Sequence, residues 1–191
     1  STAPFGAEGV TNRAVGDPGK GNGWSGALRY ANGPWKAGLS YWNADVEGGN
    51  TAVAGDQTST RLWGSYQFAM GLSVGLAFDR SKLDFATGRP DRRRSAWYIP
   101  VNYAWGPHKV YFDYARAGKT SNVANSKGSQ WMLGYDYAFS KRTSAGVYYS
   151  KVNNGRGGYY DMVAVGRNDK DLATRAGEDA RMWYFGMAHN F

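Results

Sequence analysis

The sequence has 191 residues, a formal net charge of +8 and a mean hydropathy of −0.59. No apolar run approaches the roughly 20 residues that a membrane-spanning helix needs, so a helical membrane protein is excluded. Cysteine is absent, which also excludes disulfides and cysteine-ligated metals. The 27 glycines, 14 tyrosines and 8 tryptophans favour many turns and amphipathic strands over amphipathic helices.

Nine short segments in which apolar and polar residues alternate follow one another along the chain. Such alternation places every second side chain on the same face of a strand. We therefore predict nine strands: 23–31, 35–43, 58–68, 72–82, 93–105, 108–117, 127–139, 142–151 and 179–191. Pro100 falls inside the fifth strand, where it cannot donate a ladder hydrogen bond. We expect a bulge or a local irregularity there.

The connections between these strands alternate in length. Four are tight, and most of them use residues that favour turns: 32–34, 69–71, 106–107 and 140–141. The others are long and polar, glycine-rich or charged: 44–57, 83–92, 118–126 and 152–178. Bacterial outer-membrane barrels have short periplasmic turns and longer extracellular loops. The order therefore predicts an all-β fold, a transmembrane antiparallel β-barrel.

Nine strands do not close such a barrel. Single-chain bacterial barrels have an even strand count, and an open edge in lipid leaves backbone groups unpaired. Residues 1–22 are rich in Gly, Pro, Asp and Asn and offer no tenth strand, so we assign them to an extracellular loop. We predict that 1–191 is a single β-barrel domain, the C-terminal portion of a larger barrel with nine strands in 23–191. A miscounted hairpin in a complete small barrel is the alternative.

One face of every predicted strand is apolar and rich in aromatic residues. In the last strand this face carries Trp183, Phe185, Met187, His189 and Phe191, whereas the opposite face is mostly small or polar. Aromatic residues gather near the strand ends, where the membrane interfaces lie. A buried sandwich core would also favour aromatics, but it would not leave such small side chains opposite. We predict that the apolar face contacts lipid.

The other face of the strands suits water. Its small side chains cannot fill a barrel, which implies a wide lumen. Its charged members are the predicted pore-lining residues: Arg29, Lys36, Arg61, Asp79, Arg94, Lys109, Asp113, Asp136 and Arg142. Six basic residues against three acidic ones favour anions.

The aromatic residues of this face separate two classes of barrel. A channel for a specific sugar would line its lumen with stacked aromatics, and here they look scattered: Trp63, Tyr98, Tyr111, Tyr148 and Tyr184. We therefore predict passive diffusion of ions and small hydrophilic solutes, with a modest anion preference. A substrate-specific channel or a surface adhesin barrel is the alternative.

Two motifs in the last third of the chain carry a family resemblance. Residues 128–143, GSQWMLGYDYAFSKRT, resemble the penultimate hairpin of β-proteobacterial general diffusion porins, where a Leu-Gly-Tyr strand leads into a Ser-Lys-Arg-Thr turn. Residues 185–191, FGMAHNF, resemble the Gly-apolar-x-His-x-Phe ending of that family. The family's constriction loop and early arginine cluster have no counterpart in this sequence.

The resemblance implies a sixteen-stranded homotrimer in the outer membrane of a Gram-negative bacterium, of which strands 8–16 are present here. It also implies that the terminal residues are an assembly signal that the barrel-assembly machinery reads. The members of this signal are Trp183, Phe185, Met187, His189 and Phe191.

Catalysis and metal binding have little support in the sequence. The two histidines, His108 and His189, lie at the predicted periplasmic end, whereas barrel enzymes have their active sites toward the extracellular side. Residues 168–171 with Glu178 offer carboxylates, but they lack the glycine and glutamate spacing of a calcium loop. We expect a protein that is not an enzyme and has no metal or cofactor.

The basic run at 92–94 has two possible interpretations. Clustered arginines bind nucleic acid by releasing counterions from phosphate, but the other basic residues are spread around the predicted barrel. A run at the extracellular end of a strand lies near lipopolysaccharide headgroups, whose phosphates arginine binds in bidentate fashion. We therefore expect outer-membrane lipid and lipopolysaccharide as partners, and no nucleic acid.

Overall fold

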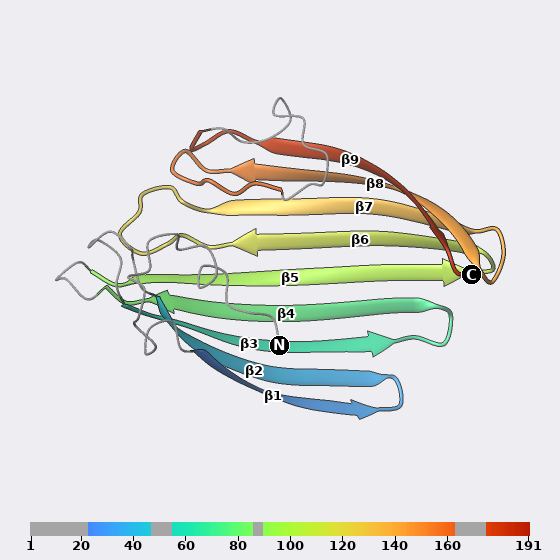
Figure 1. Ribbon diagram of the computed structural model, residues 1–191, viewed down its shortest axis with the longest axis horizontal. Coiled ribbons are helices and arrows are strands. Elements are labelled where there is room, and N and C mark those ends of the chain that lie inside the picture. Colours follow the sequence, from blue (N-terminus) through green and yellow to red (C-terminus); the bar gives the residue numbers. More distant parts are fainter. Residues whose placement is uncertain (1–22, 47–54, 86–89, 163–174) are drawn as a thin grey trace.

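The computed structural model describes residues 23–46, 55–85, 90–162 and 175–191. They form one antiparallel sheet whose nine strands follow chain order (Figure 1). The strands are β1 (Gly23–Asn32), β2 (Trp35–Val46), β3 (Gly55–Gln67), β4 (Leu72–Leu83), β5 (Arg92–Trp105), β6 (His108–Ala117), β7 (Gly128–Ala138), β8 (Thr143–Asn154) and β9 (Ala180–His189). All nine predicted strands are confirmed. The predicted extracellular loop 1–22 lies outside the described residues.

Among the described residues, the structure has no helix that is long and apolar enough to cross a membrane.

The connections divide the sheet into two unlike ends, as predicted. The turns that join β1 to β2, β3 to β4, β5 to β6 and β7 to β8 lie with the C-terminus at one end, which we call the short-turn end (Figure 1). The first three place Gly33, Gly71 and Gly106 at φ of 55°, 88° and 51°, where only glycine is free of steric cost. In the fourth, the Ser140 hydroxyl accepts the N–H of Thr143 at 3.1 Å. We call the opposite end of the strands, where the longer connections lie, the long-connection end.

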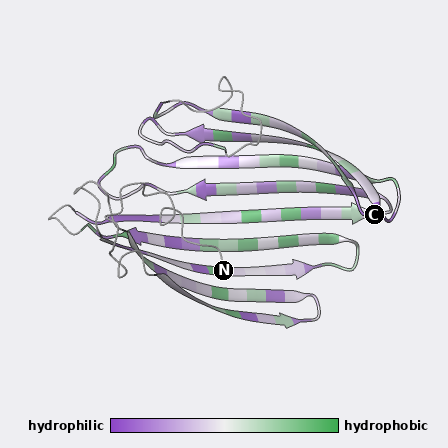
Figure 2. Cartoon of the chain, viewed as in Figure 1, coloured by the Kyte–Doolittle hydropathy of each residue, from purple (hydrophilic) through white to green (hydrophobic). Residues whose placement is uncertain are grey.

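The pairing register keeps the two faces of the sheet separate across all nine strands. Opposed residues in antiparallel strands share a face. Leu28 pairs with Leu39, Leu39 with Leu62 and Leu62 with Phe78, which places apolar residues in a row along what we call the outer face. The opposite, polar face carries Arg29. Figure 2 shows the alternation as bands of hydrophobic and hydrophilic colour along the strands.

The large apolar side chains lie on the surface and not in a core. Leu28 and Met187 are each 75% exposed, and among the described residues no large side chain is fully buried. A soluble sandwich would bury such residues between two sheets. Here a single sheet presents them on one side, as a lipid-facing strand does.

Pro100 interrupts the ladder between β4 and β5 without shifting it. Val74 pairs with Val101 and Ala77 with Tyr98, but the two intervening pairs are missing. Because the register is the same on both sides of the gap, no extra residue is inserted. The expected local irregularity is confirmed, and it is not a bulge.

Candidate pore-lining face

The polar face collects eight of the nine predicted pore-lining residues on seven neighbouring strands, β1 to β7. The pairing aligns Arg29 with Gly38 and Lys36 with Ser65, and it brings Arg61 opposite Asp79 and Lys109 opposite Asp136. Arg94 on β5 is opposite Ser81, and Asp113 on β6 is opposite Met132. That these side chains line a pore stays a prediction.

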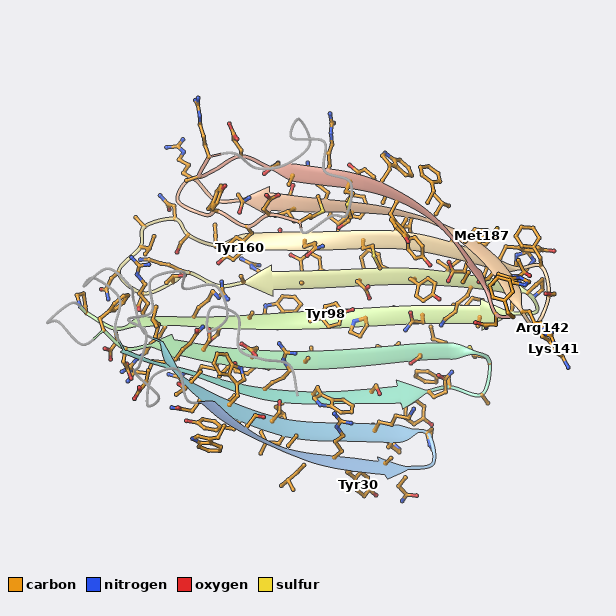
Figure 3. All side chains as sticks on the ribbon, viewed as in Figure 1. Tyr30, Tyr98, Lys141, Arg142, Tyr160 and Met187 are labelled. Carbon is orange, nitrogen blue, oxygen red and sulfur yellow. The ribbon has the colours of Figure 1, made fainter. Side chains whose placement is uncertain are left out.

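Arg142 is placed differently from the other eight. The sequence assigns it to the eighth strand, but β8 begins at Thr143 and Arg142 lies in the turn before it. Figure 3 shows Arg142 beside Lys141 at the tip of the short-turn end. Its backbone N–H donates to the Ser140 hydroxyl at 3.1 Å, which shapes the turn. Arg142 therefore lies at the rim of the sheet and not on its wall.

The carboxylates of the polar face are engaged by neighbouring side chains. Asp79 accepts the Arg61 guanidinium at 3.3 Å and the Ser59 hydroxyl at 3.0 Å. Asp136 accepts the Tyr111 hydroxyl at 2.7 Å and the hydroxyl of Tyr148. These donors occupy acceptor positions of the two carboxylates.

The basic residues of the polar face have fewer counter-charges. Within the described residues, Arg29 and Lys36 belong to no recorded ion pair, whereas Arg61 is bound to Asp79. The Lys109 ammonium lies 4.6 Å from the centre of the Tyr111 ring, an arrangement that holds a cation without neutralising it. The polar face of the described sheet therefore carries an excess of basic residues.

Three tyrosines of the polar face form a row that sequence reasoning missed. The rings of Tyr111 and Tyr148 are 6.0 Å apart, and those of Tyr148 and Tyr184 are 5.8 Å apart. Tyr148 lies across Gly134, where an added Cβ would approach its Cδ1 to 2.4 Å. The expectation of scattered lumen aromatics is wrong for this row. Only the register reveals it, because the tyrosines lie on β6, β8 and β9, far apart in sequence.

Aromatic residues of the outer face form a band near each end of the strands. Toward the long-connection end, the ring centres of Trp97 and Tyr114 are 5.4 Å apart. Toward the short-turn end, those of Tyr103 and Trp105 are 5.1 Å apart. At ~3.3 Å per residue, Trp97 and Trp105 are separated by roughly 26 Å along the strand. Without allowance for the tilt of the strand, this distance is close to the height of the apolar band of an outer-membrane barrel.

Basic residues continue the outer face beyond the band at the long-connection end. The pairing places Lys82 opposite Arg93 and Lys151 opposite Arg181. We call this group the outer basic belt. Its members are Arg80, Lys82, Arg93, Arg116, Lys151 and Arg181.

Acidic residues are interspersed in the outer basic belt. Lys82 binds Asp84 at 2.6 Å and Asp91 at 3.4 Å, and Arg93 approaches Asp91 at 3.6 Å. Desolvation opposes the ionised form of Asp91, but the bond to Lys82 and the nearby Arg93 outweigh it and lower the pKa of this carboxyl. The belt is therefore a network of both signs with basic residues in excess.

The predicted assembly signal lies on the outer face of β9 and just beyond it. Trp183, Phe185 and Met187 pair with Tyr149, Val147 and Ala145 of β8 and are 63–75% exposed. Phe191 follows the end of the strand and is fully exposed, with its ring 4.9 Å from that of His189. Figure 3 shows Met187 toward the short-turn end.

Both histidines lie on the outer face at the short-turn end and bind neighbouring hydroxyls. His108 Nδ1 is 2.7 Å from the Tyr135 hydroxyl, and His189 Nδ1 is 2.9 Å from the Thr143 hydroxyl. Among the described residues, no group of three potential ligands could hold a metal ion. The calcium-loop candidate at 168–171 lies outside the described residues.

Cysteines introduced along β7 are expected to report the two faces. At Gln130 or Met132 they should react with a small water-soluble thiol reagent, whereas at Trp131 or Leu133 they should be shielded by lipid. The measurement is the labelled fraction in intact outer membranes, and the natural chain has no cysteine to interfere. Equal labelling of both pairs would contradict the assignment of the faces.

Comparison with known proteins agrees with this geometry. A family model described as Gram-negative porin matches residues 2–158. No curated protein sequence matches the chain. Among solved structures, the anion-selective porin from Comamonas acidovorans matches with a TM-score of 0.73 and 23% identity over 88% of this chain and 49% of its own.

OmpT, an outer-membrane protein of Vibrio cholerae, matches with a TM-score of 0.64 and 12% identity over 85% of this chain and 53% of its own. The loop L8 deletion mutant of OmpT matches with a TM-score of 0.55 and 15% identity, covering 83% of this chain and 52% of its own. The chain thus spans about half the length of these structures, and its nine-stranded sheet corresponds to about half of a porin barrel. The family model covers most of the sequence, and the chain belongs to the Gram-negative porin family.

Proposed function

We propose that this chain forms part of the wall of a water-filled pore through which ions and small hydrophilic solutes diffuse passively. The observation that carries the proposal is the separation of one continuous sheet into an apolar outer face and a polar face. Large apolar groups such as Leu28 and Phe185 are 75% and 72% exposed, which water disfavours and lipid accepts. The polar face then turns toward the lumen.

We propose that the nine strands are strands 8–16 of a sixteen-stranded barrel. Within the described residues, β1 and β9 each have a strand on one side only, so the sheet has two open edges. Open edges are costly in lipid, and further strands that join β1 to β9 would remove both. Residues 1–22 would then belong to an extracellular loop, and 1–191 to one barrel domain.

A modest preference for anions follows from the charges of the wall. Asp79 is paired with Arg61, whereas Arg29, Lys36 and Lys109 keep their charge toward the polar side. A charged wall of low dielectric concentrates counter-ions along the channel. The bias should weaken with salt, because the Debye length falls from ~10 Å at 0.1 M to ~3 Å at 1 M.

The zero-current potential of the complete protein in a planar bilayer tests this selectivity. Under a low-salt gradient it should have the sign of anion preference, and Arg61→Glu should move it toward cations, because it reverses a charge on the polar face beside Asp79. Arg80→Glu makes the same charge change on the outer face and should leave the potential unchanged. A clear cation preference of the unsubstituted protein would overturn the anion assignment.

The tyrosine row favours a substrate-specific channel as a second candidate function. Tyr148 and Tyr184 border a shallow hollow of about 280 Å³ that Met132, Ser150 and Met182 complete. Aromatic rings along a channel can bind the flat faces of solutes that pass through it. Saturable solute flux would favour this function, whereas linear flux would favour passive diffusion.

The outer basic belt supports lipopolysaccharide as a partner. Its residues lie just beyond the aromatic band at the long-connection end, where the phosphates of lipid headgroups would meet them. The acidic neighbours Asp84 and Asp91 hold Lys82 in place without cancelling the basic excess. We propose no nucleic-acid partner, because the belt lies on the outer face, which we propose contacts lipid.

Assembly with other chains belongs to the same proposal. We propose that the complete protein forms a homotrimer and that the terminal residues of β9 are read by the barrel-assembly machinery. The exposed, alternating Trp183, Phe185 and Met187, followed by Phe191, support the second part.

A further inference from the structure

The segment that follows β8 folds onto the polar face of the sheet. Met162 is 7% exposed and packs with Val152 and Ala180, which are 3% and 1% exposed. Val152 and Ala180 are paired with each other and lie in the same row as Gln130, on the polar face. Residues 155–162 therefore cover the inner side of the wall at its long-connection end.

Backbone hydrogen bonds attach this segment to the connection before β7. The N–H of Gly155 donates to the Lys127 carbonyl at 2.8 Å, and that of Gly157 to the Asn125 carbonyl at 3.1 Å. At the other side, the N–H of Gly177 donates to the Gly158 carbonyl at 2.8 Å. The segment is built into the wall by three separate contacts.

Tyr160 is held through both its backbone and its side chain. Its N–H donates to the Asn154 side-chain oxygen at 2.9 Å, and its carbonyl accepts the Asn154 amide at 2.8 Å. Its hydroxyl donates to the Ser126 carbonyl at 3.1 Å. Its ring lies across Gly128, where an added Cβ would be 2.4 Å from the ring Cδ2. Position and orientation of the ring are both fixed.

Arg94 reaches this ring from β5. Its Nη1 donates to the Tyr160 hydroxyl at 3.4 Å, and its guanidinium carbon is 5.5 Å from the ring centre. Because the hydroxyl proton is used on Ser126, the oxygen presents a lone pair to the guanidinium. The ring and the hydroxyl together hold the positive charge without neutralising it. Figure 3 shows Tyr160 toward the long-connection end.

We propose that residues 155–162 form a selectivity element of the pore, in which Tyr160 is the positioning residue that holds the Arg94 guanidinium against the wall for small permeating anions. This inference rests on the proposed pore function. A segment that covers the wall narrows the passage and brings ions within the range of a fixed charge. Contacts with the hydroxyl and the ring of Tyr160 keep the guanidinium in one position as ions pass. An arginine without such contacts would spread its charge over the positions of many rotamers.

The test uses the complete protein in planar bilayers, with permeability ratios from zero-current potentials at low salt. Arg94→Gln should lower the anion-to-cation permeability ratio about twofold by removing the charge. Tyr160→Phe keeps the ring but removes the hydroxyl, and it should lower the ratio less. In the double variant, Tyr160→Phe should add nothing to Arg94→Gln, because it acts through the guanidinium. Tyr137→Phe, which removes a tyrosine hydroxyl on the outer face and outside residues 155–162, is the matched control and should leave the ratio unchanged.

Gly128→Ala provides an independent test that leaves the Arg94 guanidinium and the Tyr160 hydroxyl chemically intact. Its new Cβ would displace the Tyr160 ring, so the permeability ratio should fall as it does in Tyr160→Phe. Folded pores of every variant are first confirmed by single-channel conductance. Unchanged ratios for Arg94→Gln and Tyr160→Phe in conducting pores would overturn this inference alone. Absence of conductance in the unsubstituted protein would overturn the proposed function and this inference with it.

Discussion

Arginine in place of Leu133 is expected to destabilise the complete barrel by about 2–4 kcal/mol, the cost of a basic side chain near the middle of a lipid-facing strand. Leu133 lies on the outer face of β7 between Trp131 and Tyr137, is 51% exposed, and pairs with Phe112 and Tyr149. A guanidinium there would face hydrocarbon with no counter-charge. The measurement is the free energy of reversible unfolding in lipid vesicles, followed by tryptophan fluorescence.

The adjacent residue supplies the control. Met132→Arg makes the same addition one position away, on the polar face, where Asp113 lies opposite on β6. It should change the free energy of unfolding by less than about 1 kcal/mol, because the new charge meets water and a carboxylate. Equal losses for the two variants would show that the two faces are not lipid and water. A larger loss for Met132→Arg would reverse the facing assignment.

The local features of this fold follow from the sequence because they depend on neighbours along the chain. Alternation over a few residues sets which side chains share a face, and turn residues such as Gly33 and Gly106 mark where hairpins reverse. Strand existence, strand order and the two unlike ends were therefore all predictable. Family membership confirms the outer-membrane location and the expectation that the protein is not an enzyme.

Features that depend on distant parts of the chain were not predictable in this way. The Arg94–Tyr160 contact joins residues 66 positions apart, and nothing in the local pattern distinguishes Tyr160 from Tyr159. The start of β8 was also predicted imperfectly. The predicted strand began at residue 142, whereas β8 begins at Thr143, so Arg142 lies in the turn and not on the polar face. Register and loop packing decide such cases.

The arginine run at 92–94 illustrates why a sequence cluster is not always a surface cluster. Successive residues of a strand face opposite sides. Arg93 lies on the outer face opposite Lys82, whereas Arg94 lies on the polar face, where it contacts Tyr160. The Arg92 guanidinium lies 5.5 Å from the Phe85 ring. The three consecutive arginines thus lie in three different environments. Only Arg93 fits the hypothesis that this run binds lipopolysaccharide.

Deletion of Phe191 is expected to lower the amount of assembled protein several-fold while leaving assembled pores unchanged. Phe191 follows the last strand, is fully exposed and has a recorded ring contact only with His189 among the described residues. Removing it costs the folded sheet little packing. If the terminal aromatic is read during insertion, its loss slows assembly before the barrel exists. The measurements are the folded fraction in outer-membrane extracts and the single-channel conductance.

Phe139→Ala is the matched control for this effect, compared with Phe191→Ala. Phe139 is another exposed aromatic at the short-turn end, 64% accessible, in the turn between β7 and β8 and away from the terminus. A general need for aromatic anchors at the interface would lower the folded fraction of both variants alike. A terminal signal would lower only that of Phe191→Ala, because the control keeps Trp183, Phe185, Met187 and Phe191 in their native order. Normal membrane levels after loss of Phe191 would rule out the signal, and altered conductance would place the residue in the finished pore instead.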